Sequence, residues 1–378
     1  MLVSPRRLLA ISLASTGLMT SADAITASNA EAAFGALQQW YDPSIGLWIP
    51  NTGWWSLTVI ADLAAIDTTV RIKSIPLFAN TYARAQKYNL QMQKNVGTNW
   101  LPETFYGHHW PFFPPGWPIP SPIRTNGFLN DYYDDEGWWA LAWIAAYDIT
   151  MDRAYLSTAK SIFEDMKAAY GTTPCGGIWW DKANTYVNAI ANELFLDVAA
   201  HLANRATEKS YYLSWAKKQW AWFQKSGMIN AQHTINDGLD INTCENNGGT
   251  VWSYNQGVIL GGLSELTRAT KDNSYTVTAK QIADAAIAAL TDANGVLHDP
   301  CEPDCGADGV FARNLEILQK ASPEARYASF LDTNANSIWE TDRQGNELSV
   351  VWSGPYVAPA NASTQSSAMD ALIAALAT

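Results

Sequence analysis

The sequence predicts a single all-α domain in which six helical hairpins close into an (α/α)6 barrel. Helical periodicity recurs almost without interruption, and strand-like alternation never persists. Helices with one apolar face alternate with helices that are apolar nearly all round, which indicates an outer and an inner layer. Related segments beginning at Tyr155, Tyr212 and Tyr275 also recur at intervals of roughly 60 residues, which is room for one helical hairpin with its loops.

Twelve helices account for the six hairpins. The one expected at 153–170 is amphipathic, whereas the one at 188–206 is apolar around most of its circumference, as in a helix surrounded by others. No Gly/Ser linker or break in composition divides the chain, so we expect one domain over 25–378. The predicted helices are 26–41, 54–69, 73–90, 135–150, 153–170, 188–206, 209–225, 252–269, 273–290, 310–320, 324–342 and 364–377.

Residues 1–24 have the features of a secretory signal peptide. Arg6 and Arg7 precede an apolar run at 8–19, and Ala22-Asp23-Ala24 supplies a small-residue cleavage site. No later apolar stretch is long enough to cross a bilayer. We therefore expect a secreted protein, extracellular or associated with the cell wall, that has no membrane span and is a monomer.

The formal net charge is −12, and no basic cluster is present. Such a chain lacks the electrostatic footprint of a protein that binds nucleic acid or anionic lipid, and a neutral substrate suits it better. No histidine pair has metal-ligand spacing, so no metal is expected. Several aspartates lie in turn-rich segments, where aspartate is an ordinary turn former: Asp237, Asp240, Asp299, Asp304 and Asp308.

Four cysteines in an exported chain favour disulfides. Cys301 and Cys305 flank a short turn that can close a local loop, which leaves Cys175 and Cys244 as the second pair by elimination. The other two pairings stay open. A glycosylation sequon begins at Asn361, which requires only a surface loop.

A long segment at 97–130 interrupts the helical pattern with seven prolines and many aromatic residues. A loop of this length inside a compact domain is usually functional. We expect it to form a wall or lid of a cleft, and the alternative is a hydrophobic plug in one barrel mouth.

The segment at 130–143 contains three consecutive carboxylates, Asp134, Asp135 and Glu136, between two tyrosines and three tryptophans. Aromatic rings stack on sugars, and a close pair of carboxyls is typical of enzymes that cleave glycosidic bonds. The alternative is that the acids only complement the positive end of a helix dipole. Adjacent positions favour the short separation of a retaining mechanism, with one carboxyl anionic and the other protonated.

An inverting mechanism that pairs Asp135 with a distant base, Asp181 or Glu193, stays open. Further residues are candidates for sugar binding, because they are aromatic or hydrogen-bonding groups near predicted helix starts; packing or capping is the alternative role for each. These candidates are Tyr133, Trp138, Trp179, Trp180, Asp181, Asn192, Asn255 and Gln256.

Five segments, in order along most of the chain, carry a resemblance to a known family. They are 133–139 (YDDEGWW), 175–181 (CGGIWWD), 188–195 (NAIANELF), 250–257 (TVWSYNQG) and 364–368 (TQSSA). In these segments the chain resembles glycoside hydrolase family 76, the endo-acting α-1,6-mannanases of bacteria and fungi, and looks like a fungal-type secreted member.

The resemblance implies an (α/α)6 barrel, no organic cofactor, and α-1,6-linked mannan or mannooligosaccharide as substrate. It carries the family's adjacent aspartates onto Asp134 as nucleophile and Asp135 as acid/base. The expected activity is retaining hydrolysis of internal α-1,6-mannosidic bonds. Two alternatives stay open: a transglycosylase that remodels cell-wall or lipid-anchor glycans, and a wall protein that binds mannan without cutting it.

Overall fold

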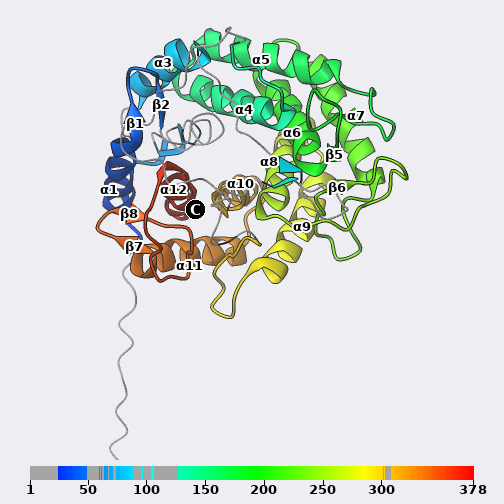
Figure 1. Cartoon of the computed structure of the whole chain (residues 1–378). Helices are drawn as coiled ribbons and strands as arrows, with labels where there is room; N and C mark the ends of the chain where they lie inside the picture. The colour runs from blue at the N-terminus through cyan, green and yellow to red at the C-terminus, as the bar shows by residue number, and fades with distance from the viewer. Residues whose placement is uncertain are drawn as a thin grey trace, which may run out of the picture.

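The computed structural model describes residues 24–48, 74–87, 127–300, 302 and 308–378, with residues 59, 61, 64–66, 68–70, 95, 96, 104 and 105. Within these residues helices dominate, and they form a double ring (Figure 1). Their bounds are α1 Ala27–Leu37, α3 Ile75–Arg84, α4 Tyr133–Thr150, α5 Arg153–Ala168, α6 Ala189–Arg205, α7 Lys209–Ser226, α8 Ser253–Thr270, α9 Ser274–Leu290, α10 Asp308–Ala321, α11 Ala325–Thr341 and α12 Ala362–Ala377.

Five described helices line the inside of the ring. α4 packs on α6, α6 on α8, α8 on α10, and α10 on α12, while α5, α7, α9 and α11 pack outside them (Figure 1). Nearly every residue of α6 is buried, whereas α5 buries one face. Burial on all sides is what an apolar circumference predicts, and one-sided burial is what an amphipathic pattern predicts. The predicted (α/α)6 barrel is confirmed.

The predicted helix boundaries agree closely with the structure. The described residues of the 54–69 segment are all helical, and a turn follows at Val70. Two predicted helices end earlier, because α1 and α3 pass into short 3-10 helices, Gln38–Trp40 and Ala85–Lys87. α4 begins two residues earlier than predicted. All but the last residue of the predicted signal peptide lies outside the described residues, as do both Cys301 and Cys305 and all but two residues of 97–126.

Short antiparallel strand pairs join the loops at the helix ends. They are β1 Tyr41–Asp42 with β2 Leu47–Trp48, β3 Asn95–Val96 with β4 Thr104–Phe105, β5 Val187–Asn188 with β6 Gly238–Leu239, and β7 Arg343–Gln344 with β8 Glu347–Leu348. The β5–β6 pair fastens the loop before α8 to the start of α6. The loops that precede neighbouring inner helices therefore lie together at one mouth of the barrel.

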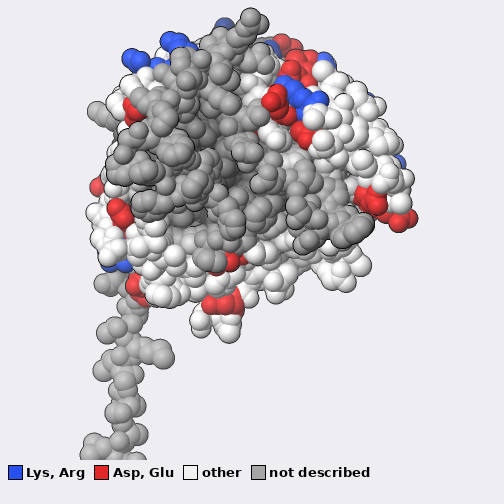
Figure 2. All heavy atoms as spheres, in the orientation of Figure 1, with Lys and Arg blue, Asp and Glu red and all other residues white. Residues whose placement is uncertain are grey.

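Surface charge and helix length bear on two further expectations. On the face shown in Figure 2, the described Lys and Arg residues lie in small separate groups rather than in one patch. Among the described helices, none combines the length and apolar character that crossing a bilayer would require.

A buried carboxyl makes stability depend on pH. Asp342 follows α11 and accepts a hydrogen bond from the Ser349 hydroxyl, while its Oδ2 is buried without a hydrogen-bond partner. Burial raises the pKa of Asp342 to about 7. The unfolded chain loses this proton near pH 4, so from about pH 4 to pH 7 only the folded protein retains it. We expect this group to lower the unfolding free energy as pH rises through that window, by at most about 1.4 kcal/mol per pH unit.

Thermal melting from pH 4.5 to 7.5 measures this effect. Asp342→Asn should flatten the dependence of Tm on pH, because the amide keeps an acceptor for Ser349 but cannot titrate. Asp272→Asn is the control, since Asp272 is exposed and hydrogen bonds from Ser274 lower its pKa. Its contribution is lost only at more acid pH, so its curve should parallel the parent's. Parallel curves for parent and Asp342→Asn would contradict the assignment.

Candidate active site

The first turn of α4 is fastened to the loop that precedes α6. The Tyr133 backbone N–H donates to the Trp180 carbonyl at 2.8 Å, and the Lys182 N–H donates to the Asp131 carbonyl at 2.9 Å. Tyr132, the residue before the helix, forms a β-bridge with Asp181. This backbone pairing fixes where α4 begins. Asp134 and Asp135 consequently occupy the first turn, where backbone N–H groups have no partner within the helix.

Both aspartates are fully buried at the N-terminal end of an inner helix. The positive end of the helix dipole favours negative charge at this position. Asp134 also lies within electrostatic range of Tyr254 on α8. Burial, and then the charges of Asp237, Asp299 and Asp134, raise the pKa of Tyr254 well above its usual range. Acids from the start of α4 and from the loops before α8 and α10 therefore lie near one another at this mouth.

Asp135 is held by Asn130, three residues before the first residue of α4. The Asn130 side-chain amide Nδ2 donates to Asp135 Oδ2 at 2.8 Å. The Asn130 carbonyl Oδ1 accepts the Tyr132 backbone N–H at 2.8 Å. One asparagine thus binds the backbone of the residue before α4 and also contacts one of the two candidate catalytic carboxyls.

Glu136, the third of the consecutive acids, makes an ion pair with Lys182. Its Oε1 lies 2.7 Å from Lys182 Nζ, which is also 2.8 Å from Asp165 Oδ2 on α5. Burial raises the pKa of Glu136 well above its ordinary value, and the charge of Lys182 opposes that shift. The Asn130 backbone N–H donates to the same oxygen at 3.1 Å. Glu136 is therefore connected to Asp135 through Asn130.

The predicted aromatic candidates divide into different environments. Trp180 is buried between Tyr132 and Tyr186, with ring centroids at 5.1 and 6.3 Å. The Tyr133 ring lies 5.4 Å from Lys182 Nζ. Trp179 retains 7% exposure, and its indole N–H has no hydrogen-bond partner. Trp138 lies on α4 one turn after Asp134, and it lines a cavity near the opposite ends of the inner helices.

That cavity has a volume of about 300 Å³ and lies away from the paired aspartates. Its charged lining is largely compensated by internal pairs. Arg205 contacts Asp148 at 2.7 Å and Glu265 at 3.0 Å, and Arg313 contacts Asp370 at 2.8 Å. This pairing fits a role in closing the far end of the barrel.

Two predicted sugar-binding amides are hydrogen-bonded to backbone. Asn192 accepts the Ile178 N–H at 2.9 Å and donates to the Ile178 carbonyl at 3.0 Å. Gln256 does the same with Ile235, at 2.8 and 2.9 Å. A side-chain amide offers one donor and one acceptor side like a peptide group, so it can satisfy buried loop backbone. These residues anchor the loops before α6 and α8.

Other candidates keep different amounts of free hydrogen-bonding capacity. Asp181 uses both carboxylate oxygens within its own loop, accepting from the Thr185 N–H and hydroxyl. Asn255 is fully buried, and neither atom of its amide group has a hydrogen-bond partner. Glu193 is likewise fully buried, and both of its oxygens lack partners. Burial, then Asp237 and Asp197, raise the pKa of Glu193 well above its usual range.

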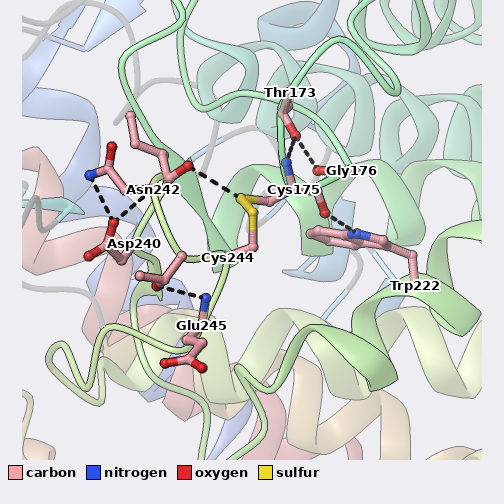
Figure 3. Close-up of a disulfide and its surroundings, with 10 residues drawn as sticks. Thr173, Cys175, Gly176, Trp222, Asp240, Asn242, Cys244 and Glu245 are labelled. Carbon is pink, nitrogen blue, oxygen red and sulfur yellow. Dashed lines mark hydrogen bonds between the residues drawn. A yellow bond between two sulfur atoms is a disulfide. The ribbon is translucent and has the colours of Figure 1, made fainter.

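The disulfide joins the loops before α6 and α8 (Figure 3). Cys175 and Cys244 are bonded with a Cα–Cα distance of 5.2 Å, in agreement with the predicted pairing. The Cys175 carbonyl accepts from the Trp222 indole at 2.9 Å. Two residues after Cys175, Gly177 has φ +68°, and a Cβ there would lie 2.5 Å from the Trp222 ring. Only glycine suits this close approach.

Asn361 stands directly before α12. Its side-chain oxygen accepts the Ser363 N–H at 2.9 Å, and Ser363 is buried. The residue therefore caps an inner helix, and its glycosylation stays a prediction.

Sequence reasoning missed part of the site. Asp237 and Asp299 are buried, with carboxylates that accept hydrogen bonds from Tyr186 and Ser253 respectively, so they are not simple exposed turn formers. Asn130 and Lys182 were also not predicted as site residues, although Asn130 begins the carboxylate segment at 130–143 and Lys182 directly follows the candidate Asp181. Their roles depend on contacts between loops that the chain order does not reveal. Within the described ranges no cluster of three metal-ligating side chains occurs.

A double ring of helices with adjacent carboxylates at one mouth has the architecture of a helical-barrel glycoside hydrolase. The chain belongs to glycosyl hydrolase family 76, whose family model matches residues 121–378. The mannan endo-1,6-alpha-mannosidase DCW1 of Candida albicans is 28% identical over 227 residues, which are 53% of this chain and 50% of the relative. The chain thus matches about half the length of such relatives.

Two solved structures share the fold. One is an inactive variant of the α-1,6-mannanase GH76A of Salegentibacter sp., with two successive aspartates changed to asparagine and α-1,6-mannotriose bound. It has a TM-score of 0.74 at 19% identity and covers 93% of this chain and 98% of the other. The second is Dfg5 of Chaetomium thermophilum with glucosamine, with a TM-score of 0.73 at 18% identity, covering 93% and 90%.

Proposed function

We propose that this protein is a secreted, retaining glycoside hydrolase that cleaves internal α-1,6-mannosidic bonds. The observation that carries the proposal is the adjacent Asp134 and Asp135 pair, buried in the first turn of an inner helix at one barrel mouth. The loops around it are fastened by backbone pairing and by a disulfide. A rigid frame of this kind is what two carboxyls need to act on one bond.

The relatives support the choice of substrate. Matching fungal proteins are mannan endo-1,6-alpha-mannosidases. The similar bacterial α-1,6-mannanase is inactive when two successive aspartates are replaced, and that variant binds α-1,6-mannotriose. An acidic chain without a basic patch also suits a neutral glycan.

In the proposed mechanism Asp134 attacks the anomeric carbon while Asp135 gives its proton to the departing glycosidic oxygen. A covalent glycosyl-enzyme forms, and the leaving sugar departs as an alcohol. Asp135, now ionised, takes a proton from water as that water attacks the same carbon and frees Asp134. Asn255 and Glu193, buried with unused hydrogen-bonding atoms, are candidates for contact with sugar hydroxyls.

A transglycosylase is the second candidate, favoured by similarity to a Dfg5 that binds the sugar glucosamine. It would use the same first step and replace water by a sugar hydroxyl in the second. Adding an acceptor sugar distinguishes the two: a hydrolase releases reducing ends at an unchanged rate, whereas a transglycosylase makes lengthened products.

The test is incubation of the full mature chain with linear α-1,6-mannooligosaccharides of increasing length. We expect shorter oligosaccharides from internal cleavage, no products from α-1,2- or α-1,3-linked controls, and no products from the Asp134→Asn/Asp135→Asn variant. Binding of the α-1,6 series without any product, by a folded parent protein, would identify a mannan-binding protein and refute the enzymatic proposal.

The same reaction reports the stereochemistry. Two displacements at one carbon retain its configuration, so proton NMR should show the α anomer of the new reducing end before mutarotation. Initial appearance of the β anomer would exclude a double displacement. The general base would then be sought among distant carboxyls, with Glu193 favoured over Asp181 because the Asp181 oxygens are already engaged.

A further inference from the structure

We propose that Asn130 is a positioning residue that determines which oxygen of Asp135 carries the catalytic proton, and that Glu136 and Lys182 hold Asn130 in place. This inference rests on the proposed role of Asp135 as acid/base. It follows from three hydrogen bonds and two ion pairs among described residues at the start of α4.

The orientation of the Asn130 amide follows from its partners. A backbone N–H can only donate, so the atom facing the Tyr132 N–H at 2.8 Å must be the carbonyl Oδ1. The amino group therefore faces Asp135 Oδ2, at 2.8 Å. An amino group can only donate, so the oxygen it contacts must accept. The carbonyl oxygen of a protonated carboxyl accepts better than its hydroxyl oxygen, so when Asp135 is protonated this contact favours the proton on Oδ1.

The remaining polar contact ties Asn130 to a charged cluster. Its backbone N–H donates to Glu136 Oε1 at 3.1 Å. The same oxygen lies 2.7 Å from Lys182 Nζ, and Lys182 also contacts Asp165 at 2.8 Å. Glu136 is fully buried, so without Lys182 its charge would be strongly disfavoured. Lys182 thus holds Glu136 Oε1 in place as the acceptor of the Asn130 backbone N–H.

Among the described residues, the charged and titratable groups around this network come from three elements. α4 supplies Tyr133, Asp134 and Glu136, α5 supplies Asp165, and the loop before α6 supplies Asp181 and Lys182. Among these groups, Lys182 is the cation, and it contacts Glu136. The gain of a carboxylate at position 130 therefore adds negative charge near Asp135. Added negative charge stabilises the protonated acid and extends activity to higher pH.

Asn130→Asp is the sharpest variant, because it keeps the shape and an acceptor for the Tyr132 N–H but replaces the amino group by an oxygen. We expect the basic limb of kcat/KM on α-1,6-mannooligosaccharides to move up by about one pH unit or more. At the parent's optimum kcat should fall about 10- to 100-fold, as expected when general-acid catalysis is impaired. An α-mannoside with an activated leaving group needs little protonation, so its glycosylation rate should change less than about threefold.

Asn273→Asp is the matched control, since this exposed residue before α9 acquires the same charge far from the site. Lys182→Met removes the cation that holds Glu136 against Asn130, so kcat on α-1,6-mannooligosaccharides should fall while glycosylation by the activated α-mannoside changes less. Lys160→Met, which removes a surface pair with Glu208, is its control. Lys182→Met also serves as the test if Asn130→Asp does not fold.

The inference is wrong if the pH profile of a folded Asn130→Asp coincides with that of Asn273→Asp. It is also wrong if activated and unactivated substrates lose rate equally with no shift, since that is the signature of a purely structural role. The two proposals fail separately. Full activity of the Asp134→Asn/Asp135→Asn variant would overturn the proposed function, whereas inactivity of that variant beside an unaltered Asn130→Asp would overturn only this inference.

Discussion

Asp134→Ala should abolish turnover on every substrate, whereas Asp135→Ala should retain glycosylation of mannosides that carry an activated leaving group. The nucleophile is needed to form the covalent intermediate whatever the leaving group, but the acid is needed only when the departing oxygen is a poor leaving group. We expect Asp135→Ala to lower kcat on α-1,6-mannooligosaccharides by about 10²- to 10⁴-fold. Steady-state and burst kinetics on matched substrates measure the difference.

Asp181→Asn and Glu193→Gln complete this experiment. Asp181 binds its own loop through Thr185, so its variant should lose stability more than catalysis. Glu193 is buried with both oxygens unpartnered, so a large loss of kcat in Glu193→Gln would favour the inverting alternative. Equal loss for the two alanine variants on activated substrates would undo the assignment of roles to Asp134 and Asp135, though not the site.

Breaking the Cys175–Cys244 disulfide should cost about 4 kcal/mol of unfolding free energy in the chain-entropy model, because the bond closes a loop with a sequence separation of 69. Cys175 belongs to the loop that anchors α6, and Cys244 to the loop before α8 (Figure 3). Both loops border the mouth that holds Asp134. The Cys175→Ser/Cys244→Ser variant should therefore melt several degrees lower and show a raised KM with a smaller change in kcat.

Cys301→Ser/Cys305→Ser is the matched comparison. If these two cysteines pair, their short loop predicts a loss of roughly 2–2.5 kcal/mol and no change in KM. Peptide mass mapping under non-reducing conditions establishes the pairing first. A Cys175→Ser/Cys244→Ser protein that melts and binds substrate like the parent would show that the bond does not hold the two loops.

Local patterns determined the fold. Helix starts and ends follow from apolar periodicity and from capping residues, which act within one or two turns, so most predicted boundaries fall within two residues of the observed ones. The alternation of one-sided and all-round apolar helices determined the two layers, because burial demands it. The paired carboxylates were also visible, since neighbours in sequence at a helix start remain neighbours in space.

The tertiary structure alone decided how the site is held together. Asn192 and Gln256 look like sugar-binding groups in sequence, yet each satisfies the backbone of a loop. A buried peptide group needs a partner, and the helix that follows each loop supplies it. Lys182 reaches Glu136 only because the loop before α6 pairs with the start of α4. The sequence by itself determined which chemical groups the protein has and which helices carry them. Only the packing of six hairpins into a closed ring decided which of those groups meet, because contacts between loops depend on the whole barrel rather than on local pattern.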